Sequence, residues 1–215
     1  MIRKLNGTLL LIMLLCACAN NKSDKPDRQT DSVIIHADTP VTKMDVSVKD
    51  EEILSFARDS ILQVFFTKEY AKLAPFISDD GILFSPYGHV DTAKNIVLSR
   101  QEFLELLKNN RKVLWGYADG TGDPIQLNIS QYFNKYVYDV AFLKAEQTSV
   151  SKLIDPDSAF LNVSTIYPHN SFAQFYFPGF NKEYEGMDWK SLLLVFKQKQ
   201  SKLYLLAIIH NQWKI

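Results

Sequence analysis

Downstream of residue 50, apolar residues first recur with the period of an α-helix. Over residues 50–66 the positions that share one face of an amphipathic helix are Ile53, Phe56, Ala57, Ser60, Ile61, Val64 and Phe65, all apolar except Ser60. We expect Thr67 to cap a second, shorter helix that continues through Phe76. A further helix is predicted after Ser99, because Ser99 and Glu102 have the spacing of a capping box and apolar residues follow.

Elsewhere the apolar pattern is that of β-strands. Alternating or continuous apolar runs bounded by turn residues predict strands over residues 82–90, 112–118, 125–129, 172–177, 189–197 and 203–210. The last two runs flank a polar turn at 198–201 and predict an antiparallel hairpin. Ser130 is expected to cap a helix through Tyr138, whereas 141–167 favours loop with short helical pieces. This order predicts an α+β domain with N-terminal helices packed on a curved antiparallel sheet.

The first seventeen residues have the layout of a bacterial signal peptide. The apolar segment Leu5–Leu15 would span about 16 Å as a helix, too short for a hydrocarbon core of ~30 Å. The sequence Leu15-Cys16-Ala17-Cys18 resembles the lipobox of bacterial lipoproteins, and Cys18 fits it better than Cys16, which follows bulky residues. We therefore predict that residues 1–17 are removed and that Cys18 is lipidated.

Residues 18–49 would then connect the lipid to a single globular domain formed by residues 50–215. This segment is polar, contains two prolines and lacks amphipathic periodicity, which is typical of a flexible tether. The prediction is an extracytoplasmic protein anchored in a membrane, at the outer membrane or cell surface if the host is Gram-negative.

Composition limits the partners and the chemistry. The chain has 24 basic and 24 acidic residues, so it lacks the basic surplus that nucleic-acid binding requires. Its two cysteines, Cys16 and Cys18, precede the domain, which therefore has neither a disulfide nor a thiolate ligand. The histidines lack the spacing of a zinc motif, so we expect no metal and no other cofactor.

Two resemblances extend this picture. The order of elements resembles the NTF2-like, or SnoaL-like, fold, a cone whose helices and sheet enclose a pocket. Five segments within residues 50–215 also resemble a family of uncharacterised bacterial lipoproteins: Phe84-Ser85-Pro86-Tyr87, Leu114-Trp115-Gly116-Tyr117 with Asp119-Gly120-Thr121-Gly122-Asp123-Pro124, Pro178-Gly179-Phe180, Tyr184-Glu185-Gly186-Met187-Asp188-Trp189 and Ile209-His210-Asn211-Gln212-Trp213. That resemblance implies a cell-envelope location and brings no activity, substrate or catalytic residue.

Candidate binding residues cluster around two glycine-containing loops. Asp119 and Asp123 offer oxygens at alternate positions, but Ser130 occupies the place of the bidentate Glu of an EF-hand, so a tight turn is favoured. Trp115 and Tyr117 alternate on the strand before this turn and are expected to share a face, lining a pocket or packing. In the second loop, Asp188 lies between Tyr184 and Trp189, an aromatic pair that could bind a sugar ring or fasten the loop to the sheet.

Candidate catalytic groups are histidines near carboxylates. His89 and Asp91 are two positions apart on a predicted strand, where the carboxylate could orient the imidazole as a general base. His210 shares a face with Gln212 near the C-terminus. A structural or surface role is the alternative for each histidine, and no motif for a serine nucleophile is present.

Three functions follow from these features. The first is a non-enzymatic envelope lipoprotein that binds a small molecule or an envelope protein in a pocket lined by Trp115, Tyr117, Asp119, Asp188, His210 and Trp213. The second is an NTF2-like hydrolase or lyase that uses His89 or His210 as a base, oriented by Asp91, Asp119 or Asp188. The third is a structural subunit of an envelope assembly. The sequence favours a protein that is not an enzyme.

Overall fold

The computed structural model describes residues 48–154 and 161–213, and the chain divides into two units, Met1–Lys43 and Met44–Ile215. The predicted signal peptide, Cys18 and the tether up to residue 47 lie outside the described residues. The helical elements are α1 (Val48–Phe56), η1 (Ala57–Leu62), α2 (Gln63–Thr67), η2 (Tyr70–Phe76), α3 (Arg100–Asn109), α4 (Ile129–Tyr136), η3 (Phe142–Lys144), α5 (Val163–Ile166) and η5 (Lys182–Tyr184). The strands are β1 (Ile82–Ser85), β2 (Ile96–Leu98), β3 (Val113–Tyr117), β4 (Pro124–Leu127), β5 (Gln147–Val150), β6 (Ser171–Phe177), β7 (Lys190–Lys199) and β8 (Lys202–Gln212).

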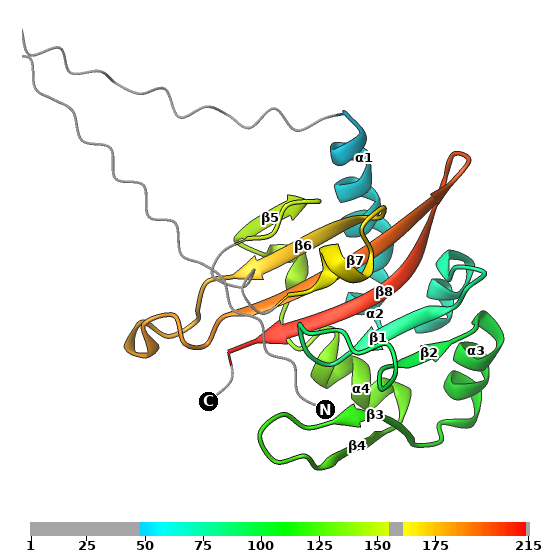
Figure 1. Cartoon of the computed structure of the whole chain (residues 1–215), viewed down its shortest axis with the longest axis horizontal. Coiled ribbons are helices and arrows are strands. Elements are labelled where there is room, and N and C mark those ends of the chain that lie inside the picture. Colours follow the sequence, from blue (N-terminus) through cyan, green and yellow to red (C-terminus); the bar gives the residue numbers. More distant parts are fainter. Residues whose placement is uncertain (1–47, 155–160, 214–215) are drawn as a thin grey trace, which may run out of the picture. The chain divides into compact units, whose positions relative to one another are not determined.

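Among the described residues, six strands form one sheet in the order β2-β1-β8-β7-β6-β5, and β3 and β4 form a separate ribbon (Figure 1). The predicted α+β class is confirmed. The sheet is mixed, because β1 lies parallel to β8 with Leu83 opposite Ala207. The expectation of a purely antiparallel sheet was therefore wrong at this pair, while the predicted hairpin β7–β8 is confirmed.

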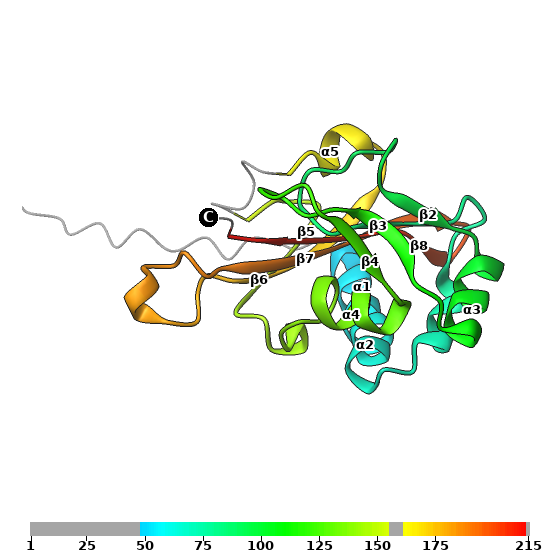
Figure 2. The same ribbon diagram turned by 90° about the horizontal axis from the view of Figure 1, so that it is seen from below.

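The two faces of the sheet carry cores of different size. The larger core lies on the face covered by α1, α2 and α4, and the smaller one lies under α5 (Figure 2). Leu192 and Leu194 of β7 point to the larger core, and Leu193 and Val195 point to the smaller. This alternation explains why β7 reads as a continuous apolar run, since both of its faces are buried.

The N-terminal helix of the domain is continuous from α1 through η1 to α2. The helix predicted over residues 50–66 is confirmed, and its central turn, η1, is π-helical. The helix ends where Lys68 adopts a left-handed φ of 58°. Thr67 does not cap the next helix; its hydroxyl donates back to the carbonyl of Gln63 at 3.0 Å. The following element, η2, is a 3₁₀-helix.

Side-chain caps define the next two helices. The predicted capping box is present at α3, where Ser99 accepts from the N–H of Glu102 and Glu102 accepts from the N–H of Ser99. At α4 the box is formed by Asn128 and Gln131, so the prediction that Ser130 is the cap was displaced by two residues. Asn and Ser are equally good caps, and the pairing with Gln131 favours Asn128.

Candidate functional site

Figure 1 shows the loop between β6 and β7 at the same end of the sheet as the C-terminal end of β8. Residues of both segments line a pocket. We call it the loop pocket. Its volume is about 660 Å³, within the usual range for small-molecule sites. The residues that line it are Tyr184, Met187, Asp188, Trp189, Lys190, Gln212 and Trp213.

Strand pairing brings the two parts of the loop pocket together. Lys190 lies opposite Gln212 in the β7–β8 register, and the N–H of Trp213 donates to the carbonyl of Trp189 at 3.1 Å. Four residues singled out in the sequence therefore share this pocket: Tyr184, Asp188, Trp189 and Trp213. Trp189 is buried and packs on Tyr176, whereas Tyr184 is 53% exposed and Trp213 is 39% exposed. The pocket thus has a buried indole and accessible rings.

Asp188 fastens the loop that forms one wall of the pocket. Its Oδ2 accepts a hydrogen bond from the N–H of Asn181 at 2.8 Å, which closes the loop across η5. Gly179 lies so close that a Cβ there would be 2.9 Å from Oδ1 of Asp188. Glu185 and Gly186 turn the chain with φ values of 49° and 82°. Asp188 itself therefore fastens the loop, a role that the sequence had suggested for the aromatic pair beside it.

Behind the loop pocket, a polar network on the helix-covered face of the sheet links β7 and β8 to the loop after α4. Lys190, which lines the pocket, forms an ion pair with Oδ2 of Asp139. His210 lies on β8, directly opposite Leu192 of β7. Its Nε2 is 3.2 Å from Oδ1 of Asp139. The aspartate therefore joins a lysine and a histidine from neighbouring strands.

Burial and charge act in opposite directions on Asp139. Burial raises the pKa of its carboxyl group, while the hydrogen bond with His210 and the ion pair with Lys190 lower it, and the net pKa lies below the ordinary value. The carboxylate is therefore charged and accepts from the imidazole N–H. Sequence reasoning missed Asp139, because it follows α4 in a stretch without a motif.

His210 forms part of this network and not of the pocket surface. Its side chain is fully buried, and its ring meets the edge of Tyr136 at 6.3 Å between ring centroids. The other ring nitrogen, Nδ1, makes no hydrogen bond within the described chain. The sequence offered Asp91, Asp119 or Asp188 as the carboxylate that orients a catalytic histidine; the carboxylate partner of His210 is Asp139. His210 is fully buried and does not line the loop pocket, and its contact with Asp139 links β8 to the loop after α4.

Four other candidate residues, His89, Asp91, Tyr117 and Asp119, line a second pocket of about 360 Å³, whereas Asp123 is not part of its lining. β1 ends at Ser85, four residues before His89, so the prediction that His89 and Asp91 share a strand face was wrong. The carboxylate of Asp91 accepts from the N–H of Ala93 and pairs with Lys94. These contacts, led by the bond from Ala93, lower the pKa of Asp91. Asp91 thus stabilises its own loop.

The glycine-containing loop beside this pocket is a tight turn. The N–H of Ala118 donates to the carbonyl of Asp123 at 2.7 Å, and Gly120 and Gly122 have φ values of 83° and 71°. This confirms the turn expected at Asp119–Asp123. Within the described ranges, no three His, Cys, Asp or Glu side chains are grouped closely enough to hold a metal ion.

Trp115 lies in the core, separate from both pockets. Its indole stacks on Tyr132 with ring centroids 3.9 Å apart, and its Nε1–H donates to the carbonyl of Leu127 at 2.9 Å. The β3–β4 register shifts between Leu114 and Tyr117, with Gly116 at a φ of 138°. This bulge breaks the alternation, so Trp115 is buried while Tyr117 is exposed, and the expectation that they share a face was wrong.

Comparisons with protein families, with curated proteins and with solved structures found no match to this chain. In the part of the chain that the structure describes, no helix combines the length and the apolar character needed to cross a membrane.

Proposed function

We propose that this chain is a lipid-anchored protein of the bacterial envelope whose domain binds a saccharide in the loop pocket. The observation that carries the proposal is the convergence of accessible aromatic rings with polar side chains at one end of the sheet. The membrane anchor is proposed on the signal peptide and Cys18, and the ligand on the chemistry of the pocket.

A saccharide fits this combination of side chains. One face of a sugar ring presents C–H groups that stack on an aromatic ring, and its rim presents hydroxyl groups that need hydrogen-bond partners. Tyr184 and Trp213 offer aromatic rings, and Gln212 offers an amide beside them, in front of the ion pair between Lys190 and Asp139. Pockets that bind small molecules combine apolar walls with a few polar groups in this way.

The alternative enzyme function has weaker support. It requires a histidine and an aspartate in contact within an accessible cavity. His210 and Asp139 are in contact, but both lie behind the loop pocket, and His210 is fully buried. His89 is accessible, but the nearby carboxylate of Asp91 is engaged with Ala93 and Lys94. The geometry therefore favours binding.

Tyr184 and Tyr117 provide a matched test of the binding site, because they are 53% and 52% exposed and line different pockets. The full-length protein, in a detergent without a sugar headgroup, is titrated with envelope glycan fragments while its thermal transition is recorded. Ligand that binds the folded state raises the midpoint. We expect Tyr184→Ala to weaken binding about tenfold or more, as for an aromatic hot spot, and Tyr117→Ala to leave it unchanged. An upshift lost in the Tyr117 variant and kept in the Tyr184 variant would refute the assignment.

The membrane anchor is tested at the two cysteines. Metabolic labelling with a fatty-acid analogue should label the wild-type protein and the Cys16→Ala variant, because the lipobox resemblance assigns the acyl chains to Cys18. The Cys18→Ala variant should lose the label entirely. If Cys18→Ala keeps the label and Cys16→Ala loses it, the lipid is attached to Cys16. If none of the three proteins is labelled, the proposal of a lipid anchor is wrong.

A further inference from the structure

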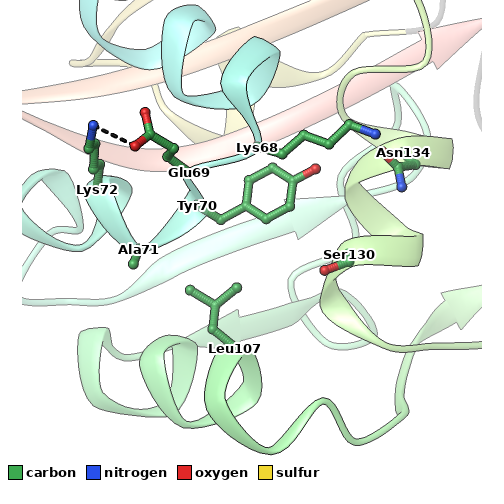
Figure 3. A pocket seen from close by; sticks show the side chains of 8 residues that line it. All are labelled: Lys68, Glu69, Tyr70, Ala71, Lys72, Leu107, Ser130 and Asn134. Atoms are coloured by element: carbon green, nitrogen blue, oxygen red, sulfur yellow. Dashed lines mark ion pairs between the residues drawn. The ribbon is translucent and has the colours of Figure 1, made fainter.

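A separate cavity of about 460 Å³ lies where the end of the N-terminal helix faces α3 and α4 (Figure 3). We call it the Lys68 pocket. It is lined by side chains from three parts of the chain: Lys68, Glu69, Tyr70, Ala71, Lys72, Leu107, Ser130 and Asn134. None of them belongs to the loop pocket, and none was a candidate binding or catalytic residue in the sequence.

Polar groups gather on the α4 side of this cavity. Figure 3 shows the side chain of Lys68 extending toward Asn134, with the hydroxyl of Tyr70 directed to the same side and Ser130 facing the cavity from α4. Leu107 of α3 supplies an apolar surface opposite them (Figure 3). The cavity therefore has one polar side, rich in hydrogen-bond donors, and one apolar side.

Tyr70 has a buried ring and an unused hydroxyl group. The residue is 5% exposed, and its ring packs on Phe133 with centroids 4.4 Å apart. Its hydroxyl makes no hydrogen bond with any residue that the structure describes. Burial raises the pKa of the phenol, so the group stays protonated and can donate. The packed ring thus holds the hydroxyl at the cavity, where it can donate to a bound molecule.

The charges around the cavity leave one cation unpaired. Lys72 pairs with Glu69 at 2.7 Å on the side away from α4 (Figure 3). Lys68 makes no ion pair within the described ranges. Its backbone ends α2 in the left-handed conformation, with its N–H donating to the carbonyl of Phe65. The turn thus fixes the position of the Lys68 backbone at the edge of the cavity, and the ammonium group can pair with a bound anion.

From these contacts we propose that the Lys68 pocket binds an oxyanion, a carboxylate or phosphate group carried by a small organic molecule. Lys68 neutralises the charge, Tyr70 and Ser130 donate hydrogen bonds to the oxygens, and the organic part rests on Leu107. Charge-assisted hydrogen bonds of this kind are about twice as strong as neutral ones. This site is independent of the proposed saccharide site, and either can fail alone.

Calorimetric titration of the full-length protein in nonionic detergent at low ionic strength tests the proposal. The probes are phenyl phosphate, benzoate and the neutral benzyl alcohol. We expect at least one of the two anions to bind, with an affinity that falls as salt is added, and benzyl alcohol to bind much more weakly. The anion that binds more tightly identifies the group. If neither anion binds at tens of millimolar, or if the alcohol binds equally well, the proposal fails.

Variants assign the charge to one lysine. Lys68→Gln should weaken anion binding about tenfold, the loss expected for one charge-assisted contact, and Lys68→Arg should restore most of it. Lys72→Gln is the matched control, because its ammonium is already paired with Glu69, and we expect little change. Tyr70→Phe should weaken binding several-fold, whereas Tyr184→Ala should not affect it. Equal binding by wild type and Lys68→Gln overturns the proposal.

Discussion

Replacing Trp115 with alanine is expected to lower the free energy of unfolding by about 3–5 kcal/mol, the range for deleting a large aromatic side chain from a core. The indole is fully buried and stacks on Tyr132. Its removal leaves a cavity and also leaves the carbonyl of Leu127 without its hydrogen-bond donor. Urea denaturation of the variant measures the loss.

Trp213→Ala is the matched control for this experiment. Trp213 is 39% exposed at the end of β8, so its replacement should cost under about 1 kcal/mol, as for most surface positions. The two variants should therefore separate a core tryptophan from a pocket tryptophan. A Trp115→Ala protein with wild-type stability and lost ligand binding would return Trp115 to the binding site and contradict the structure.

Asp139→Asn is expected to destabilise the protein at neutral pH by about 3 kcal/mol, the lower end of the range for breaking a buried ion pair. The aspartate side chain is 11% exposed and that of Lys190 is 26% exposed, so water screens the pair in part. The substitution leaves Lys190 and His210 without their carboxylate. Denaturation at pH 7 measures the loss.

The same substitution should change the acid sensitivity of the fold. The pKa of Asp139 is lower in the folded protein than in the unfolded chain, where it is about 3.9. Its stabilising contribution is therefore complete above that unfolded value and is lost as pH falls through the lowered folded value. Below about pH 4, the stability difference between wild type and Asp139→Asn should shrink. The control is Asp79→Asn, which removes an exposed pair with Lys199 and should change neutral stability little. If the stability difference between wild type and Asp139→Asn stays constant down to pH 2, the role given to Asp139 is contradicted.

Much of the secondary structure was predictable, because it is determined by residues close to one another in the sequence. The apolar period of residues 50–66 and the capping box at Ser99 are determined by neighbouring residues and survive in the structure. The hairpin β7–β8 also follows from two apolar runs around a polar turn. The parallel pairing of β1 with β8 was not predictable, because it joins residues more than 120 positions apart and leaves no periodic trace in either strand.

The sequence predicted part of the candidate site correctly, and the register of the β7–β8 hairpin explains which part. Trp189 and Trp213 meet because hairpin pairing places Lys190 opposite Gln212, and a hairpin is a local feature. The grouping of Trp115 with the loop residues failed, because the bulge at Gly116 turns Tyr117 to the surface and leaves Trp115 in the core. Alternation along a strand predicts faces only where the ladder is regular.

Asp139 and Lys68 show what sequence patterns do not reveal. Asp139 contacts His210, 71 positions away, and Asp139 belongs to no sequence motif. Lys68 follows a helix, where a lysine is ordinary, and its neighbours in the pocket come from α3 and α4. The role of such charged residues depends on contacts that only the tertiary fold creates, so it cannot be predicted from the sequence around them.

The chain contains three tryptophans, Trp115, Trp189 and Trp213, and they allow a direct test of the loop pocket. Protein labelled with 5-fluorotryptophan should give three ¹⁹F resonances, which single-tryptophan replacements assign. Titration with an envelope saccharide that raises the thermal midpoint should shift the resonances of Trp213 and Trp189, which line the loop pocket, and leave that of Trp115 in place as an internal reference. A shift confined to Trp115, or a bound saccharide that moves none of the three, would contradict the assignment of the binding site.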